Sequence, residues 1–183
     1  LSVDYPCLST KLVYTIVERR SAMNFQRLNS ISNAHVGRDF EEVALNYFKE
    51  NNIVLEKEVC LPVGVNKVKK NRSFDLGCLS SESQGMIVEC KSHKWTTSGK
   101  VPSAKMTVWN EAMYYFYLAP QGYRKIFFIL KDYKERRGET LGEYYIRTYK
   151  HLIPEDVEIM EYDSQLNEVR ELRPFVVEGS HSM

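Results

Sequence analysis

Hydrophobic positions follow two different periods along the chain, and each change of period marks a predicted element. A helical spacing predicts an amphipathic helix that enters at Gly37 and runs to about Asn51, with an apolar stripe made of Phe40, Val43, Ala44, Tyr47 and Phe48. The period then becomes two, which predicts a strand over residues 53–63. A lysine-rich loop follows. Two apolar runs, 73–79 and 86–91, then flank a turn of Ser, Glu and Gly and predict an antiparallel hairpin.

The second half of the chain alternates between helical and extended patterns. We predict a helix over 104–118, ended by Pro120 and Gly122, a buried strand over 125–130, a charged loop over 131–140, a helix over 141–153 and a last strand over 157–162. This order favours an α/β fold, with a central mixed sheet flanked by helices on both faces. We divide the chain into an N-terminal helix and connector (1–36), one core domain (37–177) and a disordered tail (178–183).

Length and composition fit a single globular domain. The chain has 183 residues, and its hydrophobic content of 43% excludes a disordered or fibrous protein. We find no leader-like start and no apolar run of the roughly 18 residues that a membrane span needs. The four cysteines, Cys7, Cys60, Cys78 and Cys90, form no CxxC pair, which argues against a zinc ribbon. We therefore expect a cytoplasmic protein with no membrane partner.

The formal net charge of +1 hides a basic central segment. Residues 61–105 hold eight basic and three acidic residues, whereas the segments on either side are net negative. The basic residues fall into two clusters, one of Lys67, Lys69, Lys70 and Arg72 and one of Lys91, Lys94, Lys100 and Lys105. A local positive patch on a nearly neutral protein favours a polyanionic partner. A solvated lysine loop explains the charge alone equally well.

Three residues of the predicted hairpin point to chemistry. Side chains alternate along a strand, so Glu89 and Lys91 share one face, and the hairpin can bring Asp75 beside Glu89. Two close carboxylates repel each other unless a cation lies between them, and oxygen ligands suit Mg²⁺ or Mn²⁺. A metal, a water held by Lys91 and a basic surround together favour phosphodiester hydrolysis. The alternative is an ordinary ion pair on a half-exposed sheet.

These residues resemble the signature of the PD-(D/E)xK nuclease superfamily, which has a restriction-endonuclease-like core. The signature places an Asp at the start of one strand and (D/E)-x-K in the adjacent strand, here Asp75 in FDLG and Glu89-x-Lys91 in VECK. The resemblance extends over residues 37–131 and includes a Glu on the preceding helix, for which we favour Glu41 over Glu42. The residue before Asp75 is Phe74, where the signature has Pro.

The resemblance implies roles for the site residues. Asp75, Glu89 and the carbonyl of Cys90 would ligate Mg²⁺ or Mn²⁺, and Lys91 would position or activate the attacking water. Glu41 would tune the site or bind a second metal. The implied activity is a metal-dependent DNA endonuclease of the restriction or defence type. A Holliday-junction resolvase or DNA-repair nuclease of the same fold is the first alternative, and a catalytically inactive nucleic-acid-binding module is the second.

DNA is the implied partner, and the basic residues are its expected contacts. Lys67, Lys69, Lys70 and Arg72 are expected on the DNA backbone, because a lysine reads charge better than base identity. Further expected contacts are His93, Lys94, Trp95, Lys100 and Lys105. Trp95 either stacks on a base or packs beneath its loop. Cutting both strands of a duplex is simplest with two copies of one site, which makes a homodimer compatible with this activity.

Overall fold

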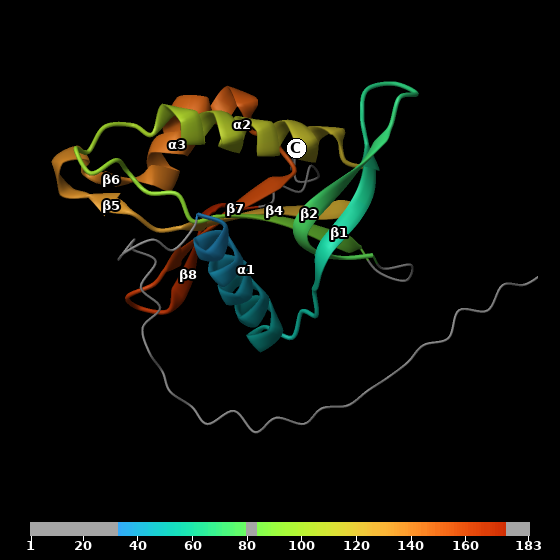
Figure 1. Ribbon diagram of the computed structural model, residues 1–183, viewed down its shortest axis with the longest axis horizontal. Coiled ribbons are helices and arrows are strands. Elements are labelled where there is room, and N and C mark those ends of the chain that lie inside the picture. Colours follow the sequence, from blue (N-terminus) through green and yellow to red (C-terminus); the bar gives the residue numbers. More distant parts are fainter. Residues whose placement is uncertain (1–32, 80–83, 175–183) are drawn as a thin grey trace, which may run out of the picture.

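The computed structural model describes residues 33–79 and 84–174 as an α/β fold with a central sheet between helices. The sheet has six strands in the order β1-β2-β3-β4-β7-β8. Helix α1 (Asn33–Glu50) covers one face, and α2 (Ser103–Leu118) and α3 (Leu141–Tyr149) cover the other (Figure 1). The predicted fold class, a mixed sheet with helices on both faces, is therefore confirmed.

The strands of the sheet run in both directions. Their bounds are Glu56–Val63 for β1, Lys70–Cys78 for β2, Gly85–Lys91 for β3, Tyr123–Leu130 for β4, Val157–Asp163 for β7 and Glu168–Arg173 for β8. Strands β3, β4 and β7 are mutually parallel, and the other neighbouring pairs are antiparallel. The three parallel strands are buried along most of their length because helices cover both of their faces, as in other parallel sheets.

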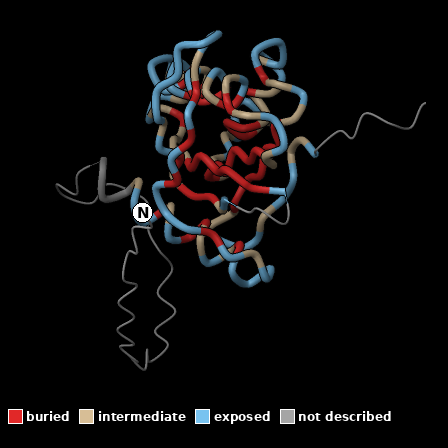
Figure 2. Tube along the Cα trace, turned by 90° about the vertical axis from the view of Figure 1, so that its right-hand side faces the viewer, coloured by how far each residue is buried: buried red, intermediate tan, exposed pale blue. Residues whose placement is uncertain are grey.

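Two hydrophobic clusters, one on each side of the sheet, form the core. On the α1 side, Phe40 and Phe48 pack with Val88 and Phe128. On the α2 and α3 side, Trp109, a residue of α2, contacts the rings of Phe127 and Tyr145. Figure 2 shows the buried residues running through the centre of the molecule and the exposed ones around it. Within the described residues, no helix is both long enough and apolar enough to cross a membrane.

Several boundaries differ from the sequence prediction. Helix α1 begins at Asn33, so Gly37 lies inside the helix and not at its entry. The segment 131–140, predicted as a loop, contains a small hairpin of β5 (Tyr133–Lys134) and β6 (Glu139–Thr140) around the 3₁₀ turn η1 (Glu135–Arg137). Helix α3 ends at Tyr149 and continues as the 3₁₀ turn η2 (Lys150–Leu152).

Strand β8 was not predicted, because its sequence EVRELR is mostly charged. It pairs with β7 at the edge of the sheet, where charged residues are common because they discourage pairing with further strands. The N-terminal helix and connector predicted over 1–36 lie outside the described residues as far as residue 32, and residues 33–36 belong to α1. The predicted tail over 178–183 also lies outside the described residues.

Strands β1 and β2 form a hairpin that projects from the sheet, which we call the arm (Figure 1). The pairing of β2 with β1 runs from Lys70 to Gly77, whereas its pairing with β3 covers only Leu76 to Cys78. The arm therefore separates from β3 at Asp75. This separation places the candidate site where two strands diverge.

Candidate active site

Asp75 lies where the regular pairing of β2 and β3 stops. The last paired residues are Leu76 and Val88, and beyond them the backbone N–H of Cys90 donates to Asp75 Oδ2 at 2.7 Å. The strand also turns here, because Phe74 and Leu76, which period two should place on one face, belong to the clusters on opposite faces. The Asp75 side chain thus bridges two strands that are moving apart.

Three oxygen atoms from these strands surround the ammonium group of Lys91. Its Nζ donates to Glu89 Oε2 at 2.8 Å, to the Cys90 carbonyl at 3.0 Å and to Asp75 Oδ2 at 3.3 Å. We call these three atoms the oxygen cluster. The predicted meeting of Asp75 with Glu89 and Lys91 is present. The side chain of Glu89 is fully buried, which argues against an ordinary surface ion pair.

Burial and the charge of the opposite partner act in opposite directions on the pKa values of Glu89 and Lys91. Burial raises the pKa of Glu89, and the positive charges of Lys91 and Arg72 oppose that rise. Burial lowers the pKa of Lys91, but the negative charges of Glu89 and Asp75 outweigh it and raise the pKa above its ordinary value. Lys91 is therefore a cation at neutral pH, held by oxygens that attract positive charge.

Glu41 faces this site from α1, and Glu42 does not. Burial, and after it the negative charge of Asp75, raises the pKa of Glu41. Glu42 is exposed and pairs with Lys57 of the arm. Of the two glutamates that the sequence offered for this position, the structure favours Glu41, because the charges of Asp75 and Lys91 act on it.

The oxygen cluster fits a hard divalent cation in its chemistry. Two carboxylates and a backbone carbonyl are the donors that Mg²⁺ and Mn²⁺ prefer, and Mg²⁺ commonly keeps several waters as its other ligands. The ammonium of Lys91 already takes the position of a cation among these atoms. Of the two groups that Cys90 could offer as a metal ligand, only the backbone carbonyl is suitable. Burial and then the charge of Asp75 raise the pKa of the thiol well above its ordinary value, so the thiol stays protonated. Over 33–79 and 84–174, no set of three or more His, Cys, Asp or Glu side chains forms a metal site.

Arg72 belongs to this site and is not a free surface charge. Its Nη2 donates to Glu89 Oε1 at 2.8 Å, and its guanidinium lies 4.4 Å from the centre of the Tyr115 ring on α2. Sequence reasoning grouped Arg72 with the lysines of the loop and assigned no role to Tyr115. Strand alternation gives no reason to place Arg72, three residues before Asp75, at the same site, and the turn of β2 at Asp75 is visible only in the structure.

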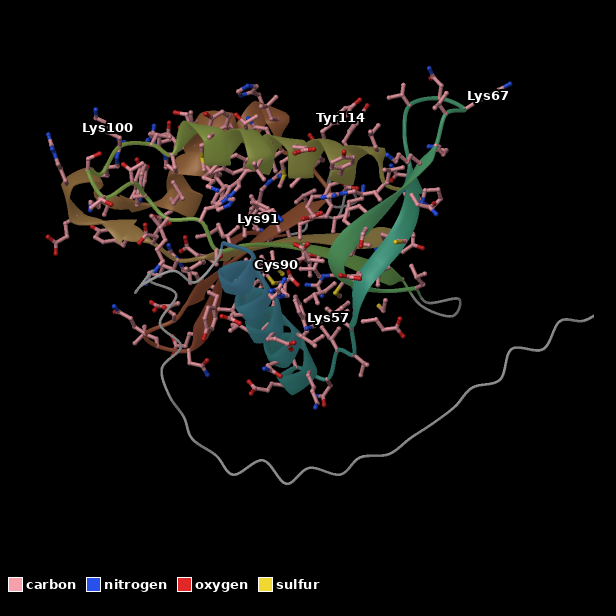
Figure 3. The ribbon with its side chains drawn as sticks, in the orientation of Figure 1. Lys57, Lys67, Cys90, Lys91, Lys100 and Tyr114 are labelled. Atoms are coloured by element: carbon pink, nitrogen blue, oxygen red, sulfur yellow. The ribbon has the colours of Figure 1, made fainter. Side chains whose placement is uncertain are left out.

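The remaining predicted DNA contacts are spread over the molecule. Lys67, Lys69 and Lys70, which we call the arm lysines, are exposed at and near the tip of the arm. Lys100, in the loop before α2, and Lys105, on α2, are also exposed. Figure 3 shows Lys67 and Lys100 at opposite ends of the molecule, with Lys91 between them. The structure thus distributes exposed cations on both sides of the oxygen cluster.

Trp95 is not available for stacking on a base. Its side chain is 7% exposed and packs edge-on against Tyr144, and the Trp95 backbone N–H donates to Asp132 Oδ2 at 2.7 Å. Of the two alternatives for this residue, packing beneath the loop is correct. Trp95 is therefore removed from the expected DNA contacts.

His93 is an uncharged residue beside the site. Its Nδ1 accepts a hydrogen bond from the indole N–H of Trp109 at 2.8 Å, which leaves the proton of the neutral ring on Nε2. Burial, and then the charges of Lys105 and Lys91, lower the pKa of His93 to about 4. Any contact of His93 with phosphate would therefore use a neutral N–H donor. Lys94, the next residue, is partly exposed.

The aromatic run at the end of α2 divides between core and surface. Met113 and Phe116 are buried, whereas Tyr114 and Tyr117 are exposed. Figure 3 shows Tyr114 on the outer side of the helix.

Comparisons of the sequence and fold with protein-family models, curated proteins and solved structures gave no match. The assignment of a function to this chain therefore depends on the geometry of the site.

Proposed function

We propose that this protein is a metal-dependent DNA endonuclease that hydrolyses phosphodiester bonds with an activated water. The convergence of three oxygens, from Asp75, Glu89 and Cys90, on the ammonium of Lys91 carries the proposal. A buried carboxylate, a second carboxylate and a lysine side by side are costly to maintain without a use, because burying charge is unfavourable. Mg²⁺ or Mn²⁺ is the cation that this donor set suits.

Each residue of the site has a defined task in this reaction. Asp75, Glu89 and the Cys90 carbonyl would hold the cation, and Glu41 would tune their charge from α1. When bound, the metal lowers the pKa of a coordinated water and polarises a phosphoryl oxygen. Lys91 would position or activate the attacking water, and its ammonium group can donate hydrogen bonds to that water and to the phosphate.

The exposed lysines support DNA as the substrate. The arm lysines, Lys100 and Lys105 are exposed, and Lys67 and Lys100 lie on opposite sides of Lys91, as a long polyanionic substrate would require. Among the biological roles of such an enzyme we place restriction or defence first, and a junction resolvase or repair nuclease second. Two copies of the chain would cut both strands of a duplex.

Cleavage of plasmid DNA tests the proposal. The wild-type protein should nick or cut it with Mg²⁺ or Mn²⁺ and stop with EDTA, and Asp75→Asn, Glu89→Gln and Lys91→Met should each be inactive. Glu139→Gln is the matched control, since Glu139 also pairs with a basic residue, Arg147, but lies away from the oxygen cluster. A wild-type protein that cuts no plasmid, single strand or four-way junction, yet binds DNA in a salt-sensitive way, would leave only a binding module.

A further inference from the structure

Arg72 and Lys91 each bind one oxygen of the Glu89 carboxylate. Arg72 Nη2 donates to Oε1 at 2.8 Å, while Lys91 Nζ donates to Oε2, also at 2.8 Å. The Glu89 side chain has no exposed surface, so these two cations stand where water would otherwise solvate the carboxylate. One cation therefore fixes each oxygen of the Glu89 carboxylate, and of the two only Oε2 belongs to the oxygen cluster.

Tyr115 restricts the position of Arg72. The guanidinium lies over its ring at 4.4 Å from the centroid, a distance at which the ring attracts a cation. The Arg72 side chain is 36% exposed, although its Nε is buried and makes no hydrogen bond within the described part of the chain. Arg72 is thus clamped between a buried carboxylate of β3 and an aromatic ring of α2.

We propose that Arg72 is a positioning residue of the active site, which fixes Glu89 so that Oε2 is presented to the metal and Oε1 is withheld. This inference depends on the function proposed above. It replaces the expectation that Arg72 binds the DNA backbone. A side chain that contacts the phosphate backbone contributes to affinity, whereas one that orients a ligand of the metal contributes to turnover and to metal binding.

The two roles predict different kinetics for Arg72→Gln. Loss of an outer partner of a metal ligand typically costs 10- to 100-fold in metal affinity or activity, so we expect kcat to fall by about that factor with KM within about threefold of wild type. Calorimetry with Mn²⁺ should give an affinity about tenfold weaker, independently of cleavage. Arg147→Gln is the matched control, because Arg147 also pairs with a glutamate and lies over a tyrosine ring. It should change neither quantity.

Chemical rescue and ring substitutions separate positioning from a general loss of structure. Guanidinium ion added to Arg72→Ala should restore part of kcat, and sodium chloride at the same ionic strength should not. Tyr115→Phe keeps the ring under Arg72 and should behave as wild type. Tyr115→Leu removes the ring and should lower kcat in the same direction as Arg72→Gln, by a smaller factor.

The outcomes distinguish this inference from the proposed function. If the wild type cuts DNA and Arg72→Gln raises KM at unchanged kcat and unchanged Mn²⁺ affinity, Arg72 is a backbone contact and the inference is overturned. If the wild type neither cuts DNA nor binds Mn²⁺, the proposed function fails by itself. A metal-free crystal structure of Arg72→Gln then decides the positioning role. A displaced Glu89 carboxylate supports it, and one still seated on Lys91 refutes it.

Discussion

Replacing Lys91 by methionine tests whether its ammonium holds the place of a metal cation. The substitution keeps a long unbranched side chain but removes the charge that three oxygens share. Glu89, which is fully buried, then has only Arg72 as a partner, and Asp75 faces it without a cation between them. Removing one partner of a buried ion pair costs about 3–5 kcal/mol. Because Arg72 remains, we expect the free energy of unfolding to fall by about 3 kcal/mol, the lower end of that range.

Thermal unfolding with and without Mn²⁺ measures both the stability lost in Lys91→Met and the competition between Lys91 and the metal. For a protein of this size, each kcal/mol corresponds to roughly 2–4 °C, so the metal-free variant should melt about 6–12 °C below wild type. Metal has no ammonium to displace in the variant, so Mn²⁺ should bind it more tightly and raise its Tm more than that of wild type. Stabilisation is about 2.7 kcal/mol when free metal is at 100 times Kd, which would recover most of the deficit.

The deficit of Lys91→Met should also depend on pH, with a defined sign. Burial raises the pKa of Glu89, and the loss of Lys91 raises it further. A carboxyl group with a raised pKa in the folded state stabilises the fold below its unfolded pKa, and that contribution is lost as pH rises through the folded pKa. The difference in Tm should therefore be small near pH 5 and grow toward pH 8.

Two results would refute this reasoning. A deficit that is the same at pH 5 and pH 8 would mean that Glu89 is not left as an uncompensated charge. Equal stabilisation of both proteins by Mn²⁺ would mean that Lys91 and the metal do not compete for the oxygen cluster. Lys131→Met is the control, since Lys131 pairs with a single partly exposed carboxylate, Asp163. It should lose no more than about 1 kcal/mol and show no added response to Mn²⁺.

Three further predictions concern residues around the site. Glu41→Gln should weaken Mn²⁺ binding and slow cleavage about tenfold, whereas Glu42→Gln, which loses only the pairing with Lys57 on the surface, should match wild type in both assays. Replacing the three arm lysines by alanine should make the plot of the logarithm of the DNA-binding constant against log[salt] less steep by up to about 3, because each phosphate contact contributes about 0.9. An unchanged slope would exclude the arm from the DNA interface. Trp95→Ala should lower the unfolding free energy by about 3–5 kcal/mol, yet leave DNA affinity intact in the folded protein, and a selective loss of affinity would contradict its burial in the core.

The main elements could be predicted from the sequence because their patterns are local. The helical stripe of residues 40–48 and the apolar run of residues 125–130 fix a helix and a buried strand, which the structure has as α1 and β4. Elements whose stability comes from their neighbours were missed. The charged strand β8 exists because β7 offers it an edge, and the start of α1 lies four residues before Gly37.

The candidate site divides in the same way. The sequence by itself determined that Asp75, Glu89 and Lys91 share one hairpin, because strand alternation and a short turn suffice to bring them together. Only the tertiary structure decided the surroundings. It favours Glu41 over Glu42, buries Trp95 and brings Arg72 onto Glu89. These facts depend on how α1, α2, α3 and the arm pack against the sheet, and on the turn of β2 at Asp75. Contacts between elements distant in the chain leave no period in a single sequence.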